Sequence, residues 1–330
     1  MHCKSCLIEG LEYEIRFEGN HNQSVIPNII NHLNRRKIDV KVQDNLLFIK
    51  EMGVNELIDF CRDHMQLALV YFRLPNQEWK PLSTIQETLD MQWIDEVIKK
   101  KQLTCYFQPI VDERENIFAY EILSRFVKED GTLIYPDVIF EAARKRGRLY
   151  ALDRLCRLTA VKSAAKIKDK KVFINFIPTS IYSPEFCLQS TTRLANTLGI
   201  NPSQLCFEVV ETERVDDVNH LKEILSYYKE KGFEYALDDV GEGYNTIEMI
   251  EDITPHYMKL DMQFVQGVAV DFNKQQVAKS MLRKSIELGS IPLAEGIESK
   301  EDFEWLKREG YKLFQGYLFG KPTPEIDDVI

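Results

Sequence analysis

The chain has 330 residues, a length typical of about two domains, and its 44% hydrophobic and 28% charged content is that of an ordinary globular protein. Its 52 acidic residues outnumber its 42 lysines and arginines. The resulting net charge of -10 argues against binding to nucleic acid polymers or to an anionic membrane surface. No run of about 18 apolar residues exists, so the sequence predicts no membrane-spanning helix.

Seven cysteines are scattered along the chain, and this odd count favours free thiols in a reducing cytoplasm over a disulfide framework. The segment 1–10 has no apolar core behind a basic start, so we expect no secretory signal peptide. Cys3 and Cys6 form one CxxC pair beside His2. Because a structural zinc needs four ligands, this pair is only a weak indication of metal or redox chemistry.

Residues 1–85 are predicted to form a small α+β domain. Their apolar pattern predicts strands at 11–17, 40–42, 46–49 and 67–72, and helices at 25–33 and 55–65. The order β-α-β-β-α-β is that of the ferredoxin-like, or split βαβ, arrangement. The region holds no constellation of catalytic groups, so we expect a sensory or interaction module that receives a protein or small-molecule input.

Residues 86–330 are predicted to form a second, α/β domain. Eight short apolar strands are expected, at 104–110, 117–123, 171–176, 205–210, 233–237, 257–260, 291–294 and 311–314. Eight strands with helical patterns between most of them, over about 240 residues, match the (β/α)8 or TIM barrel. Only residues 111–116 separate the first two strands, which is too short for a crossover helix, so we expect one antiparallel strand.

The strand at 233–237 runs directly into two adjacent carboxylates, Asp238 and Asp239, and a glycine-spaced turn follows. Two neighbouring negative charges cost on the order of 1–4 kcal/mol at an effective dielectric between those of water and protein surface. Such a pair persists if it lies in solvent or if a cation neutralises it. We interpret the pair as metal ligands.

The other predicted strands also deliver a polar group near one end. In chain order, the groups at all strand ends are Gln108, Glu121, Asn175, Glu208, Asp238 with Asp239, Lys259 with Asp261, Glu295 and Gln315. Active sites of barrels are built from such positions. Glu121, Asn175, Glu208, Asp238, Asp239 and Glu295 are oxygen ligands, which favours Mg²⁺ or Mn²⁺ over zinc. Six such ligands suffice for two ions that activate water. The alternative for any one of these acids is that it simply faces solvent at a strand end, but that explanation does not suit so many strands at once.

Eight separated segments resemble the EAL-domain family of cyclic-di-GMP phosphodiesterases, over about residues 93–322. They are YFQPIV at 106–111, EILSR at 121–125, NFIP at 175–178, FEVVETE at 207–213, DDVGEGYN at 238–245, MKLD at 258–261, AEGIE at 294–298 and QGYLFGKP at 315–322. The resemblance implies a modified TIM barrel with a reversed strand, in agreement with the strand count. It further implies a bacterial second-messenger enzyme that acts on cyclic di-GMP and forms a homodimer through the barrel.

The resemblance also implies a role for each matching residue. Glu121, Asn175, Glu208 and Asp238 would hold one metal ion, and Asp238 would bridge to a second ion held by Asp239 and Glu295. Lys259 matches the lysine that orients or deprotonates the attacking water, Gln315 the glutamine that fixes the water network, and Glu211 the glutamate that braces the loop after the aspartates. Gln108, Leu123, Arg125 and Asp261 match positions that contact substrate.

Departures from the family pattern concentrate in the loop after the aspartates. The signature triplet reads Glu-Ile-Leu, which leaves its glutamate in place. The loop usually reads DFGTGYSS, whereas this chain has Val240, Glu242 and Asn245-Thr246 at the differing positions. Glu242 adds a negative charge near Glu211 and the metal ligands, so we expect a weaker brace and slower turnover, or turnover that depends more on the amino-terminal domain.

The leading hypothesis is therefore a metal-dependent phosphodiesterase that hydrolyses cyclic di-GMP to linear pGpG. The complete ligand set favours this enzyme. The altered loop keeps open a second hypothesis, a receptor that binds cyclic di-GMP without hydrolysing it and signals to a protein partner. A barrel scaffold without a nucleotide ligand is the third. The sequence contains no GGDEF-type cyclase segment, so we expect degradation of the messenger.

Overall fold

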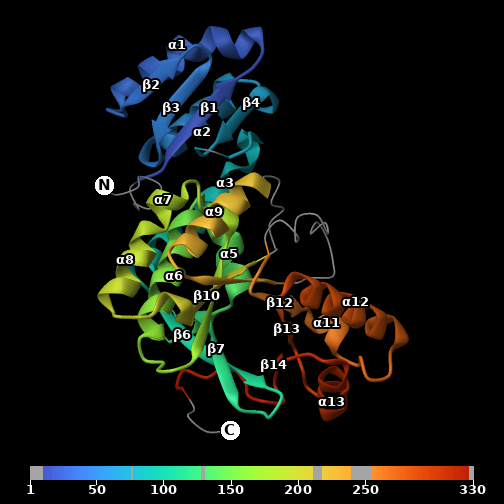
Figure 1. Ribbon diagram of the computed structural model, residues 1–330. Coiled ribbons are helices and arrows are strands. Elements are labelled where there is room, and N and C mark those ends of the chain that lie inside the picture. Colours follow the sequence, from blue (N-terminus) through green and yellow to red (C-terminus); the bar gives the residue numbers. More distant parts are fainter. Residues whose placement is uncertain (1–9, 76, 128–130, 211–217, 239–253, 327–330) are drawn as a thin grey trace. The chain divides into compact units, whose positions relative to one another are not determined.

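The computed structural model describes residues 10–75, 77–127, 131–210, 218–238 and 254–326 (Figure 1). They divide into two compact units. The first unit contains the chain up to Lys101 together with Asp137–Leu152, and the second contains Gln102–Pro136 and the chain from Asp153 onward. The expected domain boundary between residues 85 and 86 stays a prediction. The sequence pattern contained no signal that Asp137–Leu152 groups with the amino-terminal part.

The first unit is built on a five-stranded sheet with strand order β2-β3-β1-β4-β5. Its elements are β1 (Glu12–Phe17), α1 (Asn20–Arg35), β2 (Val40–Gln43), β3 (Leu46–Lys50), α2 (Val54–His64), β4 (Val70–Arg73), β5 (Lys80–Pro81), α3 (Ile85–Leu89), α4 (Trp93–Lys100) and α5 (Pro136–Lys145). Strand β1 is antiparallel to both β3 and β4, and the first six elements follow the predicted β-α-β-β-α-β order. The expected small α+β region is therefore present, with β5 added at one edge.

Alternation along β1 explains how this sheet acquires its core. Tyr13, Ile15 and Phe17 are fully buried, whereas the residues between them are partly exposed. Successive side chains of a strand point to opposite faces, so one face of the sheet is apolar. The buried face packs in one cluster with Leu33 of α1 and Leu57 of α2.

The second unit contains a closed ring of eight strands. These strands are β6 (Leu103–Asp112), β7 (Ile117–Val127), β9 (Lys171–Phe176), β10 (Leu205–Val209), β11 (Glu234–Leu237), β12 (Tyr257–Leu260), β13 (Ile291–Ala294) and β14 (Leu313–Gln315). Strand β6 is antiparallel to its neighbours β7 and β14, and every other pair in the ring is parallel. This confirms the predicted TIM barrel with one reversed strand. The short β8 (Leu133–Ile134) pairs with β7 outside the ring.

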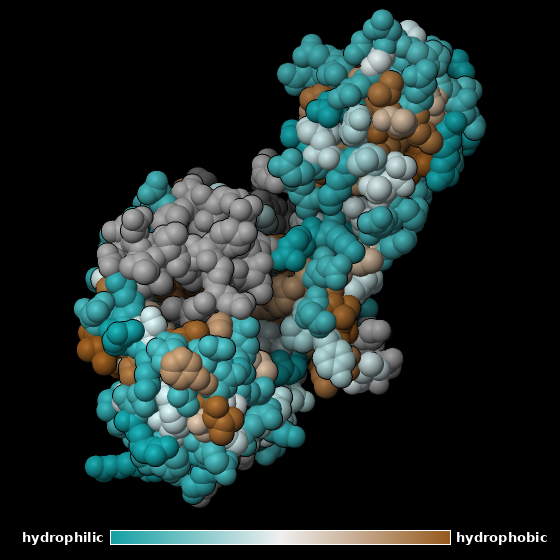
Figure 2. Space-filling view, turned by 90° about the vertical axis from the view of Figure 1, so that its right-hand side faces the viewer, coloured by the Kyte–Doolittle hydropathy of each residue, from teal (hydrophilic) through white to brown (hydrophobic). Residues whose placement is uncertain are grey.

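Helices connect the strands of the ring (Figure 1). They are α6 (Leu149–Ala164), α7 (Pro184–Cys187), α8 (Gln189–Thr197), α9 (Val218–Glu230), α11 (Met262–Val265), α12 (Phe272–Leu288) and α13 (Lys300–Glu309). Among the described helices, none combines the length and the hydrophobicity needed to cross a bilayer. The coloured residues on the face shown in Figure 2 are mostly hydrophilic, with scattered hydrophobic patches.

One apolar cluster takes a single buried residue from each of the eight strands of the ring. Its members are Ile110, Ala119, Phe173, Cys206, Ala236, Tyr257, Leu293 and Leu313. Inward-pointing side chains of a barrel fill its interior in layers, and inward positions recur every second residue along each strand. The cluster therefore identifies, on every strand, which neighbouring position also faces the barrel axis.

Candidate active site

A polar layer lies directly above the apolar layer of the barrel. Each parallel strand has its polar residue two positions after the member of the apolar cluster, and β6, which runs the opposite way, has it two positions before. This polar layer consists of Gln108, Glu121, Asn175, Glu208, Asp238, Lys259, Glu295 and Gln315. The two-residue period of strands thus brings all eight residues to the carboxyl end of the parallel strands, where barrel active sites lie.

Glu121 of β7 is the centre of one half of the polar layer. Its Oε1 accepts a hydrogen bond of 2.6 Å from the amide of Asn175, and its Oε2 accepts one of 2.7 Å from the amide of Gln315. The same amide nitrogen of Gln315 lies 3.2 Å from Oε1 of Gln108. Both carboxylate oxygens therefore have a fixed orientation, set by side chains from two other strands.

Lys259 of β12 is the centre of the other half. Its Nζ lies 2.6 Å from Oε1 of Glu208 and 3.4 Å from Oδ1 of Asp238, and it forms a third ion pair with Glu295. The side chains of Lys259 and Glu208 are essentially inaccessible to solvent. A buried ammonium requires such partners, because an isolated charge inside a protein is very costly. Lys259 is therefore a structural part of the barrel interior and not a surface lysine.

Burial and neighbouring charge set the pKa values in this cluster. Burial alone would lower the pKa of Lys259, but Asp238, Glu208 and Glu121 outweigh it and hold the pKa above its ordinary value. Burial raises the pKa of Glu208, and the carboxylates of Glu121 and Asp238 add to this against the effect of Lys259, so that the pKa is well above the ordinary value. Burial would raise the pKa of Glu121, but Lys259 and the side-chain amides of Gln315 and Asn175 outweigh it, so the pKa is lowered.

The donor set fits a divalent cation. Both carboxylate oxygens of Glu208, and Oε1 of Glu295, are buried without an aligned hydrogen-bond donor among the described residues, although Lys259 is close enough to form ion pairs. Buried oxygens are normally satisfied, and a hard cation satisfies carboxylates directly. Within the described residues, no three acidic, histidine or cysteine side chains already surround one point, and Lys259 lies between the carboxylates instead. Asp239 and Glu211 lie outside the described residues.

The residues predicted to contact substrate lie next to the polar layer. Leu123 and Arg125 follow Glu121 at two-residue intervals on β7, so all three share a face of that strand. The Arg125 guanidinium lies 5.4 Å from the centroid of the Tyr106 ring and donates a hydrogen bond to the carbonyl of Ser124. Asp261 follows Lys259 in the same way, and its carboxylate caps α11 by accepting a 2.7 Å hydrogen bond from the amide of Gln263. Their roles toward substrate stay predictions.

The sequence analysis missed a buried ion pair beside the site. Asp153 and Arg157, one turn apart on α6, lie 2.5 Å from each other, and both are almost fully buried. Oδ1 of Asp153 also accepts a 3.0 Å hydrogen bond from the amide of Ile177, two residues beyond Asn175. The spacing of an aspartate and an arginine by four residues on an expected helix was the available signal, but such pairs are usually exposed.

Gly316 is a further residue that sequence reasoning passed over. A Cβ at this position would lie 2.1 Å from the carbonyl oxygen of Ile297 and 2.2 Å from its amide nitrogen. We expect Gly316→Ala to lower the free energy of unfolding by about 1–3 kcal/mol, the range for overpacked sites, because backbone atoms must move. Gly10→Ala is the control, since no heavy atom lies within 4 Å of its Cβ. Equal unfolding free energies for the two variants in urea would contradict the collision.

The charge on Lys259 offers a second prediction. We expect Lys259→Met, measured in a chelator, to lose about 3–5 kcal/mol of unfolding free energy, because three carboxylates would then lack their cation. Mg²⁺ should raise the unfolding temperature of this variant more than that of the parent protein. Lys312→Met is the matched control, because Lys312 pairs with Glu113 at 2.7 Å but is 54% exposed. Equal losses of unfolding free energy in the two variants would show that the buried carboxylates depend on the ammonium no more than an exposed ion pair does.

The similarity of this chain to known proteins lies in the region that contains the polar layer. The family model described as EAL domain matches residues 91–322. Among similar proteins of Escherichia coli (strain K12), the "Probable cyclic di-GMP phosphodiesterase PdeG" is 28% identical over 236 residues, covering 70% of this chain and 46% of that protein. The "Cyclic di-GMP phosphodiesterase PdeF" is 27% identical over 242 residues, covering 72% and 32%. The matched part is less than half of either relative.

A solved structure adds a comparison of the fold. The standalone EAL protein from Vibrio cholerae O395, in its form bound to c-di-GMP, is 37% identical and superposes with a TM-score of 0.60, covering 67% of this chain and 92% of that one. The family match spans more than two thirds of the 330 residues and contains every member of the polar layer. The chain therefore belongs to the EAL domain family.

Proposed function

We propose that this protein is a phosphodiesterase that hydrolyses cyclic di-GMP to linear pGpG with the help of Mg²⁺ or Mn²⁺. The observation that carries the proposal is the polar layer, in which buried carboxylate oxygens of Glu208 and Glu295 lack aligned donors in the part of the chain that the structure describes. The names of the curated relatives, and the bound nucleotide in the Vibrio cholerae structure, supply the substrate class.

Glu121, Asn175, Glu208, Asp238, Asp239 and Glu295 are the residues we propose to hold two ions. When bound, divalent ions polarise a phosphodiester and make water more acidic. In the hydrolysis, a water oxygen forms a new bond to phosphorus, the bond from phosphorus to the 3′ oxygen breaks, and the 3′ oxygen takes a proton. Opening the cyclic dinucleotide at one phosphodiester in this way leaves linear pGpG, which carries a 5′ phosphate.

Each remaining residue has a task that its position allows. Lys259, whose raised pKa keeps it an ammonium, orients the attacking water from among its carboxylates. Gln315, which donates to Glu121 and lies near Gln108, fixes polar groups around that water. Arg125 is suited to a phosphate because a guanidinium can donate two parallel hydrogen bonds to it.

A receptor that binds cyclic di-GMP without hydrolysing it is the alternative. The observation that favours it is the position of Lys259, whose ammonium already neutralises carboxylates that would otherwise bind cations. The substitutions at Val240, Glu242, Asn245 and Thr246 point the same way, although they lie outside the described residues. A homodimer formed through the barrel is likewise a proposal, to be tested by light scattering.

Product analysis tests the proposal. Purified protein with cyclic di-GMP and Mg²⁺ or Mn²⁺ should yield pGpG by chromatography, and a chelator should stop the reaction. Glu121→Gln should lower kcat by at least about 100-fold, because removing one positioned charged group from such a site typically costs this much. Glu113→Gln, an exposed carboxylate at the turn between β6 and β7, should retain parental kcat. Full activity of Glu121→Gln would refute the ligand assignment, and tight binding without product would establish the receptor.

A further inference from the structure

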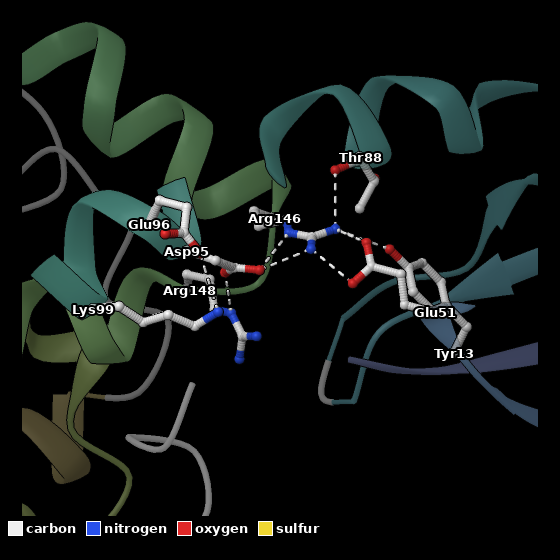
Figure 3. A network of polar contacts seen from close by, with 8 residues as sticks. All are labelled: Tyr13, Glu51, Thr88, Asp95, Glu96, Lys99, Arg146 and Arg148. Carbon is white, nitrogen blue, oxygen red and sulfur yellow. Dashed lines mark hydrogen bonds and ion pairs between the residues drawn. The ribbon is translucent and has the colours of Figure 1, made fainter. Parts of the chain in front are cut away.

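Among the described residues, the largest fully buried side chains are those of two arginines, Arg146 and Arg157. Arg146 belongs to the first unit, where its guanidinium contacts the carboxylates of Glu51 and Asp95 and the hydroxyl of Tyr13 (Figure 3). These partners all belong to the same unit, and none is a member of the polar layer, so Arg146 serves the interior of its own unit. Arg157 belongs to the second unit, which contains the polar layer.

Arg157 holds Asp153 in place from two directions. Its Nη1 lies 2.5 Å from Oδ2 of Asp153, one turn earlier on α6, and its Nε donates a 3.1 Å hydrogen bond to the hydroxyl of Thr191 on α8. The other oxygen of Asp153, Oδ1, accepts a 3.0 Å hydrogen bond from the amide of Ile177. Each carboxylate oxygen therefore has its own donor. Because displacing one partner would leave a buried charge unpaired, the pair restricts how its neighbours can be arranged.

The amide that Asp153 accepts lies where β9 has lost one of its two neighbours. Within the described residues, the ladder between β9 and β7 ends at Ile174, whereas the ladder with β10 continues to Phe176. Backbone groups of successive strand residues point toward opposite neighbours, and the carbonyl of Phe176 accepts from the amide of Val210 on the β10 side. The amide of Ile177 therefore points toward β7, and Asp153 supplies the acceptor that a buried amide needs there.

Asn175 lies in the same segment, two residues before Ile177. Its connection to β7 is made by its side chain, whose Nδ2 donates the 2.6 Å hydrogen bond to Oε1 of Glu121. Because the nitrogen of the carboxamide is used in this way, the oxygen is the atom that can bind a cation. The direction in which that oxygen points depends on the backbone around it. On the β7 side, Asp153 fixes this backbone through the amide of Ile177.

We propose that Asp153 and Arg157 are positioning residues, which fix the end of β9 and so direct the amide of Asn175 to Glu121 and its oxygen to a bound divalent ion. Both residues act through Asn175. Groups that orient a metal ligand in this way typically contribute a factor of about 10–100 to metal affinity or activity. The effect on ion binding and turnover rests on the proposed function, whereas the placement of Asn175 does not. The two claims can therefore be tested with separate measurements.

The test variant is Asp153→Asn. An asparagine has one acceptor oxygen in place of two, so Arg157 and the amide of Ile177 cannot both keep their bonds. The matched control is Asp302→Asn, because Asp302 is also buried, at 6% exposed against 3% for Asp153. Its two oxygens likewise accept one backbone amide each, at 3.0 and 2.9 Å, but these amides lie between α11 and α12. Thr191→Val is a milder second variant, which removes the hydroxyl that holds Arg157.

Hydrogen exchange of the Asn175 side-chain amide tests the placement, by NMR of the ¹⁵N-labelled full-length protein without metal or nucleotide. We expect roughly tenfold faster exchange in Asp153→Asn, because the bond to Glu121 then opens more readily, and an unchanged rate in Asp302→Asn. An unchanged rate in Asp153→Asn, or an equal rise in Asp302→Asn, would overturn the inference. If Asp153→Asn does not fold, Thr191→Val decides: it should show a smaller rise, and no rise would overturn the inference.

Ion binding and kinetics then test whether this placement matters for the site. The Kd for Mn²⁺, measured by electron paramagnetic resonance without nucleotide, should rise roughly tenfold or more in Asp153→Asn and stay unchanged in Asp302→Asn. With cyclic di-GMP, kcat of Asp153→Asn should fall roughly tenfold while KM changes little, as expected when a group at the reacting centre is misplaced. Unchanged Mn²⁺ affinity and kcat in Asp153→Asn would contradict the link to the site. Absence of Mn²⁺ binding and turnover in the parent protein would refute the proposed function alone, and the exchange experiment would still decide the placement of Asn175.

Discussion

The candidate site depends on the pairing of one buried ammonium with carboxylates from neighbouring strands. Lys259 contacts Glu208, Asp238 and Glu295 inside the barrel. Without a cation, several carboxylates in a space of low dielectric would repel one another by several kcal/mol. With the Lys259 ammonium between them, the carboxylates remain close together, and some of their oxygens still have no aligned hydrogen-bond donor among the described residues, as those of Glu208 show. We propose that divalent cations also bind to these oxygens.

The closed barrel makes this concentration of charge possible. Every strand alternates between inward and outward positions, so an apolar layer with one residue from each strand is followed by a polar layer with one residue from each. The apolar layer excludes water from below and holds the strands in register. The reversed strand β6 obeys the same rule in the opposite direction, which places Gln108 beside Gln315.

Much of this arrangement could be predicted from local sequence. The apolar segments predicted the eight strands, and the short 111–116 connection predicted the antiparallel pair, because both depend on residues close together in the chain. The polar residues at strand ends were also visible, from Gln108 to Gln315. Which of them pair was not, because the contacts of Glu121 with Asn175 and Gln315 depend on barrel closure and register.

The longest-range features were the least predictable. Nothing in the pattern around Arg146 indicated that it would meet Glu51, 95 residues earlier in the chain. Asp153 looked like an ordinary helical residue, whereas its burial and its bond to Ile177 are tertiary effects. Periodicity reports which face of an element is buried, but it does not report which distant residue covers that face. Charged residues that become buried are therefore the ones that sequence reasoning most easily overlooks.

The most direct test of the central claim is to follow the oxygen that water contributes. The protein should be incubated with cyclic di-GMP and Mn²⁺ in ¹⁸O-labelled water, and the nucleotides analysed by mass spectrometry. Hydrolysis at the polar layer predicts pGpG with one heavy oxygen in its terminal phosphate. With a chelator present, no pGpG should form. Recovery of unlabelled, intact cyclic di-GMP from a protein that demonstrably binds it would contradict the phosphodiesterase and establish a receptor.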